Sequence, residues 1–280
     1  MNKLNLLSKN RAEELGYDLW DDFIVPPYFQ ILDLHIARKP RVILGGRGCG
    51  KTMLLRYFSH YTQFSIKRKD IDFDKIEGIG LYWKVDSQYA RSMHARNIDN
   101  EIWESAFIHY SVLTIGLELI KSIESILNSN VSSSTKDDIR SIKFNNLIAY
   151  TKQSFANLIE IKEYITLKKQ EFSIWLNQPK TLDAPIFLPK DFLYDLIDCV
   201  LKIDSLKSKI IQIYIDEYEN LKEYQQILLN TWLKHSEGKL IFNLAVKKNA
   251  FRTTSTHSQE SITAVHDFTT HDIEKYTLDN

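Results

Sequence analysis

Residues 45 to 52 read Gly45-Gly46-Arg47-Gly48-Cys49-Gly50-Lys51-Thr52. This order of residue types is the G-x-x-x-x-G-K-[ST] pattern of a phosphate-binding loop, the Walker A motif. An apolar run at 42–44 precedes it and a helix-forming run at 53–58 follows it, which is the strand–loop–helix context that the motif requires. We therefore predict that this loop binds a nucleoside triphosphate. The alternative is a glycine-rich turn with an incidental lysine.

The residue types of this loop suit a phosphate ligand. Glycines let successive backbone N–H groups curve around phosphate oxygens, and the N-terminus of the following helix adds positive potential. We expect Lys51 to reach the β- and γ-phosphates and the Thr52 hydroxyl to bind Mg²⁺. The predicted nucleotide-binding set is Gly45, Gly46, Arg47, Gly48, Cys49, Gly50, Lys51, Thr52 and Met53.

A second motif, of Walker B type, ends an apolar run at 210–215 with Asp216 and Glu217. The run suits a central parallel strand that is covered on both faces, and its carboxyl end is where α/β sheets bind ligands. We predict that Asp216 holds the magnesium shell through water, and that Glu217 is the base that polarises the attacking water. The alternative is the acidic start of a helix, since Asp and Glu favour first turns.

A further apolar strand is predicted at 239–246, and Lys247, Lys248 and Asn249 follow it. A polar side chain at the end of such a strand can contact the γ-phosphate or the attacking water. Asn249 is the candidate for this role, while either lysine or a plain strand-exit turn is the alternative. The predicted catalytic residues are therefore Glu217, Lys51 and Asn249.

Composition places the chain among soluble globular proteins. Of its 280 residues, 44% are apolar, and its 36 basic and 36 acidic residues cancel. A neutral chain gives no support for a large nucleic-acid footprint. Two cysteines, no apolar run near 18 residues and no signal peptide predict a cytoplasmic protein without a disulfide framework or a membrane span.

The pattern along the chain predicts an α/β fold, a parallel-sheet P-loop core with a large helical insertion. The expected units are residues 1–98 with the first half of the core, an insertion at 99–205, and residues 206–280 with the second half. Within the insertion we expect a long helix to 128, a polar turn at 128–135, and a second long helix at 154–177.

Shorter signals lead to more local predictions. Thr135 with Asp138 resembles a capping box, which predicts a helix from there through Tyr150. A short helix is expected at 8–16, and the last residues, 273–278, are expected to form a strand. The histidines near the end, His257, His266 and His271, lack metal-ligand spacing and are expected in a polar surface loop.

The two motifs together resemble the AAA+ ATPases, most of all the bacterial set in the origin-recognition branch. Gly16-Tyr17-Asp18-Leu19-Trp20 before Pro26 and His266-Asp267-Phe268 near the end are similar to that set as well. The resemblance implies an ATP-hydrolysing core that oligomerises or changes shape with nucleotide state, and for many such proteins a role beside effector proteins in defence against phage. AAA+ proteins normally continue into a helical lid, which this sequence does not show. Either the sequence is a piece of a longer chain, or the insertion or a partner is expected to serve as the lid.

Three functions remain open at this point. The first is an ATPase switch that uses Mg–ATP to reset contacts with a protein partner. The second is a scaffold that holds ATP without turnover and assembles through the helical insertion. The third is a nucleic-acid-loading ATPase, against which the neutral charge argues. Metabolic kinases are disfavoured, because adjacent Asp216 and Glu217 would activate water and waste ATP.

Overall fold

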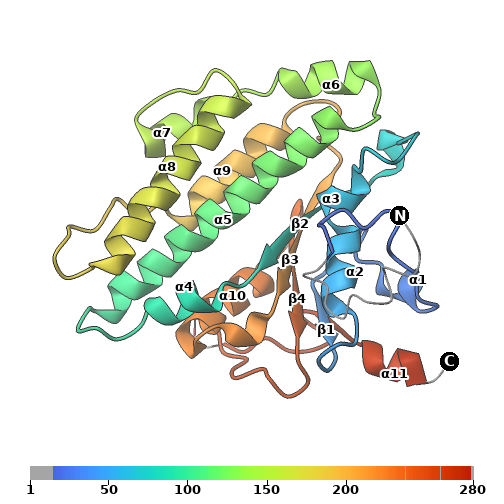
Figure 1. The fold of residues 1–280 in the computed structure, drawn as a ribbon. Coiled ribbons are helices and arrows are strands. Elements are labelled where there is room, and N and C mark those ends of the chain that lie inside the picture. Colours follow the sequence, from blue (N-terminus) through green and yellow to red (C-terminus); the bar gives the residue numbers. More distant parts are fainter. Residues whose placement is uncertain (1–14, 237, 259, 279–280) are drawn as a thin grey trace.

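The protein is an α/β structure built on one parallel sheet (Figure 1). The computed structural model describes residues 15–236, 238–258 and 260–278. Five strands lie in the order β2-β3-β4-β1-β5, and every neighbouring pair is parallel. The strands are β1 Arg41–Leu44, β2 Gly78–Lys84, β3 Ile210–Asp216, β4 Leu240–Val246 and β5 Thr269–Asp272. The predicted fold class, a parallel-sheet P-loop core with helices, is confirmed.

Helices cover both faces of this sheet (Figure 1). They are α1 Phe29–Leu32, α2 Lys51–Phe58, α3 His60–Gln63, α4 Ser87–Ser92, α5 Asn100–Asn128, α6 Ser133–Arg140, α7 Ile148–Thr151, α8 Leu158–Asn177, α9 Lys190–Leu201, α10 Glu223–Lys234 and α11 Ile273–Leu278. Short 3₁₀ turns lie at Phe73–Lys75, Asn145–Leu147 and Tyr218–Asn220.

The alternation of side chains along each strand divides the core into two clusters. In β2, Leu81 and Trp83 face the larger cluster with α5 and α10, while Tyr82 faces the smaller cluster with α2. Val42 and Ile43 of β1 divide in the same way. Because successive side chains of a strand point to opposite faces, strands buried on both sides read as apolar runs. This explains why β1, β3 and β4 were visible in the sequence.

Gly80 lets the end of α2 approach the sheet closely. A Cβ atom at this position would lie 2.1 Å from the backbone oxygen of Phe58 and 2.6 Å from the Tyr214 ring. No side chain tolerates such distances, so a glycine is required here for packing and not for an unusual backbone angle. As a consequence α2, which follows the phosphate-binding loop, lies directly on β2 and β3, and β3 leads into the acidic residues Asp216 and Glu217.

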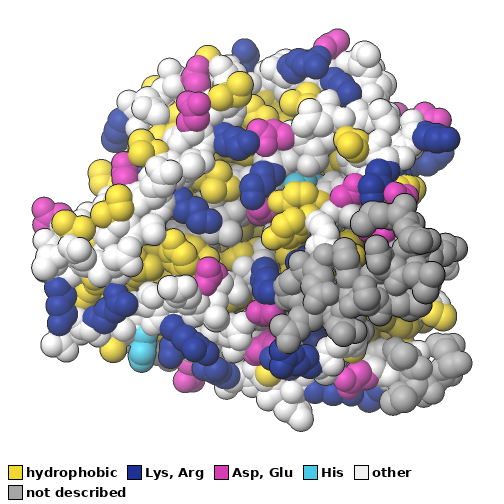
Figure 2. Space-filling view, in the orientation of Figure 1, with side chains coloured by type: hydrophobic (Ala, Val, Ile, Leu, Met, Phe, Trp, Pro, Cys, Tyr) yellow, Lys and Arg dark blue, Asp and Glu magenta, His cyan; other side chains and the backbone are white. Residues whose placement is uncertain are grey.

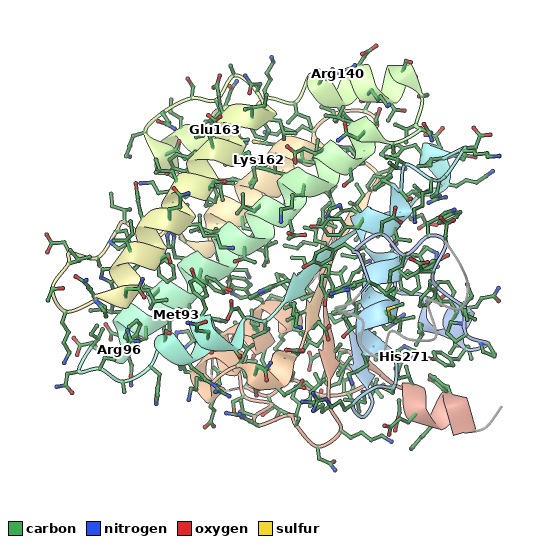
Figure 3. The ribbon with its side chains drawn as sticks, viewed as in Figure 1. Met93, Arg96, Arg140, Lys162, Glu163 and His271 are labelled. Atoms are coloured by element: carbon green, nitrogen blue, oxygen red, sulfur yellow. The ribbon has the colours of Figure 1, made fainter. Side chains whose placement is uncertain are left out.

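The helices between β2 and β3 share the core of the sheet. The central helix, α5, packs against β2, α8, α9 and α10, and Trp103 near its start contacts Trp175 near the end of α8, so α5 and α8 are antiparallel. Arg96 fixes the same end by donating to the backbone oxygen of Leu176 at 2.8 Å (Figure 3). By length and composition, α5 is the one helix of the described chain that could span a membrane, but 78% of its apolar window is buried inside the protein.

Two local predictions were wrong. The segment 273–278 is helix α11 and not a strand; the last strand is β5, whose residues Thr269 to Asp272 are too polar to give an apolar signal. The cap before α6 is Ser132, which accepts from the Thr135 N–H at 3.2 Å, and this helix ends at Arg140 instead of continuing through Tyr150. The predicted helix at 8–16 falls largely outside the described residues.

His271 is also placed differently from the prediction. It was expected in a surface loop, but it lies in β5 with 5% of its surface exposed, and its Nδ1 lies 3.2 Å from the Tyr276 hydroxyl of α11 (Figure 3). Among the described residues, no group of three or more His, Cys, Asp or Glu side chains gathers in the manner of a metal cluster.

Candidate nucleotide-binding site

The phosphate-binding loop connects the end of β1 to the start of α2. Gly48 and Gly50 have φ angles of 83° and 94°, a left-handed conformation that glycine adopts without strain. The Lys51 amine points back over the loop and donates to the carbonyls of Gly45 and Gly46, at 2.7 Å each. The loop therefore holds the Lys51 amine against its own backbone.

Three other members of the predicted set lie around the same loop. Arg47 is exposed, Met53 is half-buried in the first turn of α2, and the Cys49 thiol donates to the Gly46 carbonyl at 3.0 Å. The loop is thus braced internally by Cys49 and Lys51 and remains open at Arg47.

The acidic end of β3 meets α2 through one short hydrogen bond. The Thr52 hydroxyl donates to Asp216 Oδ2 at 2.7 Å, although β4 separates β3 from β1 in the sheet. The carboxylate is 1% exposed and accepts two more hydrogen bonds, from the Tyr82 hydroxyl at 2.8 Å and from the Glu217 N–H at 2.9 Å. Asp216 is therefore a buried carboxyl group that accepts hydrogen bonds from α2, from β2 and from the turn that follows β3.

Tyr82 was missed by the sequence analysis. Burial, and then the negative charge of Asp216, raise the pKa of this phenol above its usual value. The hydroxyl therefore stays protonated and donates to Asp216 across the physiological pH range. The only sequence signal was an aromatic residue inside β2, two positions before its end.

Glu217 has both carboxylate oxygens engaged. Asn220 donates to Oε2 at 2.8 Å, and the Lys84 amine lies 3.3 Å from Oε1. Its backbone is left-handed, with a φ of 57°, which is uncommon outside glycine and clusters at functional sites. Lys84 comes to this place because it ends β2 and pairs in register with Asp216. Neither Lys84 nor Asn220 was singled out from the sequence.

The residues after β4 are arranged as a row of ion pairs. The Lys247 amine lies 3.0 Å from a carboxylate oxygen of Glu219, and the Lys248 amine lies 3.0 Å from Asp272 and 2.7 Å from Glu274. Asn249 is exposed, with a left-handed φ of 60°, and its side chain makes no hydrogen bond that the described chain shows. The sensor role for Asn249 therefore stays a prediction.

A magnesium ion fits the donors at the Thr52–Asp216 contact. Mg²⁺ prefers oxygen ligands and is usually held by one or two carboxylates together with water and substrate phosphates. Here one carboxylate and one hydroxyl oxygen lie 2.7 Å apart beside the phosphate-binding loop. This arrangement suits such an ion better than a cage made only of protein ligands.

Aromatic side chains that precede β1 pack against the last turn of α2. The Phe23 and Tyr57 rings stack with centroids 4.2 Å apart, and the Phe29 and Phe58 rings stack at 4.6 Å. Phe58 belongs to the smaller core cluster, so the Phe29 contact joins this segment to the core between α2 and the sheet.

Two hollows of the described surface lie away from this site. One of about 680 Å³ lies between α8 and the segments that flank it, and another of about 470 Å³ lies between the end of α5, α6 and the start of α8. Neither is lined by the phosphate-binding loop or by Asp216. We place the candidate site by its residues, because loop, hydroxyl and buried carboxylate converge at one edge of the sheet.

Comparison with known protein families agrees with this geometry. A family model described as ORC-CDC6-like matches residues 5–280. The chain belongs to the ORC-CDC6-like family. Among curated proteins and among solved structures, no match was found. The family match confirms the predicted resemblance to the origin-recognition branch and places the ORC-CDC6-like chain with AAA+ ATPases, a class that binds nucleotide with Mg²⁺.

Proposed function

We propose that this ORC-CDC6-like protein binds and hydrolyses Mg–ATP and acts as a nucleotide-driven switch for a partner protein. The observation that carries the proposal is the 2.7 Å contact between Thr52 and Asp216. It joins the first turn of α2, where phosphates would lie, to the buried acidic end of β3. A glycine-rich turn with an incidental lysine would not require a buried carboxylate at this place.

Each residue has a distinct part in the proposed reaction. The loop amides and Lys51 bind the phosphates, and Thr52 with Asp216 holds Mg²⁺, which neutralises phosphate charge when it is bound. Glu217 accepts a proton from the attacking water and orients it. Asn249 is proposed to contact the γ-phosphate or this water.

Lys84 and Asn220 hold the proposed base in its present position. These contacts occupy one side of each carboxylate oxygen, with Asn220 on Oε2 and Lys84 on Oε1. Glu217 orients the attacking water when one of these two contacts opens. Nucleotide binding would have to open it, so we expect hydrolysis to depend on the position of Lys84 at the end of β2.

Steady-state ATP turnover tests this proposal directly. The wild-type chain is compared with Lys51→Ala, which removes the phosphate ligand, and with Glu217→Gln, which removes the base. Turnover in the wild type that both variants lose supports hydrolysis. Tight ATP binding without turnover in the wild type would favour the scaffold, and a wild type no faster than either variant would contradict the ATPase.

The partner contact is proposed for the layer of helices between β2 and β3. Figure 2 shows Lys and Arg side chains interspersed with Asp and Glu over the face it displays, which gives a nucleic acid no single-sign surface to follow there. Salt-sensitive DNA binding would revive the loading alternative. The defence setting rests on the resemblance alone, and phage plaque counts with wild-type and Lys51→Ala chains test it.

A variant that lacks residues 131–178 would remove much of this layer of helices, but it would not test the partner contact cleanly. The deletion removes Ile161, Ile165 and Phe172, which are fully buried in the main core. Point substitutions at exposed positions of α8 are cleaner, and Leu167→Ser at a side chain that is 52% exposed is one choice. Loss of a co-purifying partner with unchanged unfolding would support a contact there.

A further inference from the structure

Helix α11 begins directly against the first two glycines of the phosphate-binding loop. A Cβ atom on Gly45 would lie 3.1 Å from the side chain of Ile273, and one on Gly46 would lie 2.3 Å from Glu274 Oε1. Consecutive residues of α11 therefore occupy the space beside consecutive glycines. The first half of the loop is enclosed between β1 and α11.

Glu274 bonds to the loop itself. Its Oε1 accepts the Gly46 N–H at 2.5 Å, and its other oxygen lies 2.7 Å from the Lys248 amine. Lys248 follows β4, so one carboxylate joins α11, the phosphate-binding loop and the end of β4. The hydrogen bond from Lys248, and then the one from Gly46, hold the pKa of Glu274 below its usual value, so this carboxylate stays charged.

Two carboxylates share one amine at this contact. The Lys248 amine lies 3.0 Å from Asp272 and 2.7 Å from Glu274, and the Lys51 amine on the Gly46 carbonyl is the second positive charge beside them. Gly46 donates to Glu274 through its N–H and accepts from Lys51 through its carbonyl at 2.7 Å. The carboxylate and the amine that would hold a phosphate are thus at most about 9 Å apart, close to the screening length at physiological salt.

A bound triphosphate brings several negative charges to the Lys51 side of this loop. They would repel the Glu274 carboxylate and attract the Lys248 amine, and both effects weaken the contact between Glu274 and the loop. We propose that Glu274 is a nucleotide-sensitive latch, which ties α11 to the phosphate-binding loop and is released when a nucleoside triphosphate binds. This inference rests on the proposed function, because it requires ATP at the loop.

The test is a calorimetric titration with Mg–ATPγS, a slowly hydrolysed ATP analogue. Glu274→Gln keeps an acceptor for Gly46 but removes the charge, so we expect it to bind about three- to tenfold more tightly than the wild type. The matched control is Glu260→Gln, which breaks another 2.7 Å pair with a lysine, Lys234, that is far from the loop. The control should bind as the wild type does, within twofold.

Hydrogen exchange of α11 provides the second measurement. We expect Mg–ATPγS to speed amide exchange of the peptide that covers 273–278 in the wild type. Glu274→Ala, which lacks the latch, should exchange fast without nucleotide and change little when it is added.

Two results would overturn the latch while leaving ATP binding intact. One is Glu274→Gln binding no more tightly than wild type, which would make Glu274 a simple support of the loop. The other is slower or unchanged exchange of α11 in wild-type protein saturated with nucleotide. If wild-type protein bound no more ATPγS than Lys51→Ala, the proposed function itself would fail, and the latch with it.

Discussion

Removing the Tyr82 hydroxyl should damage the site in a measurable and specific way. This hydroxyl is one of three donors to the buried Asp216 carboxylate, at 2.8 Å. A hydrogen bond to a charged group contributes about 1.5–3 kcal/mol, whereas one to a neutral acceptor contributes about 1 kcal/mol. We therefore expect Tyr82→Phe to lower the free energy of unfolding by about 1.5–3 kcal/mol.

The sheet provides a matched control for this substitution. Tyr214 pairs in register with Tyr82, is fully buried and donates to the neutral backbone carbonyl of Leu34 at 2.9 Å. Tyr214→Phe should therefore cost about 1 kcal/mol, less than Tyr82→Phe. Urea unfolding of the two variants beside the wild type measures both values.

The two variants should also differ in Mg²⁺ dependence. Without its hydroxyl donor, Asp216 accepts fewer hydrogen bonds and a cation stabilises it more, so Mg²⁺ should restore part of the stability that Tyr82→Phe loses. Tyr214→Phe should show no such recovery. Equal losses in the two variants, together with no effect of Mg²⁺ on either, would refute the view that Tyr82 acts through the Asp216 charge.

Two further predictions concern packing and pH. Gly80→Ala should destabilise the fold by about 1–3 kcal/mol or more, because its Cβ would lie 2.1 Å from the Phe58 carbonyl, while Gly16→Ala, with open space around it, should be nearly neutral in thermal unfolding. Burial lowers the pKa of His109 from 6.5 to about 4. Below pH 6.5 the unfolded chain takes up a proton on this side chain and the folded chain does not. The free energy of unfolding should therefore be about 2 kcal/mol lower at pH 5 than above pH 6.5. His109→Gln should flatten this slope in urea unfolding at pH 7 and pH 5, and an unchanged slope would contradict the assignment.

Much of the fold was readable because its signals are local. The loop at 45–52 and the apolar run that ends in Asp216 and Glu217 are each contiguous in the sequence. The loop follows a strand that is buried on both faces, and the apolar run forms another such strand. The same reasoning failed where polarity hid a strand. The residues of β5 carry no apolar alternation, and the sheet includes them because β1 offers a free edge for parallel pairing.

The remaining parts of the site come from sheet register and tertiary packing. Tyr82 and Lys84 reach Asp216 and Glu217 because β2 pairs with β3 residue for residue. Glu274 reaches Gly46 because α11 turns back on the loop after β5. In the sequence these residues lie far from both motifs, and nothing in their spacing marks them. A contact that depends on strand order is invisible until that order is known.

The rate of phosphate release from ATP by the wild type and by Glu217→Gln, at equal nucleotide saturation, tests whether Glu217 is the base of an ATPase. Loss of a positioned general base costs about 10²–10⁴-fold in rate, whereas the half-exposed pair with Lys84 contributes at most about 1 kcal/mol to stability. We expect Glu217→Gln to bind Mg–ATP and to unfold much as the wild type does, but to release phosphate at least about a hundredfold more slowly. Equal rates in the two proteins would contradict this expectation.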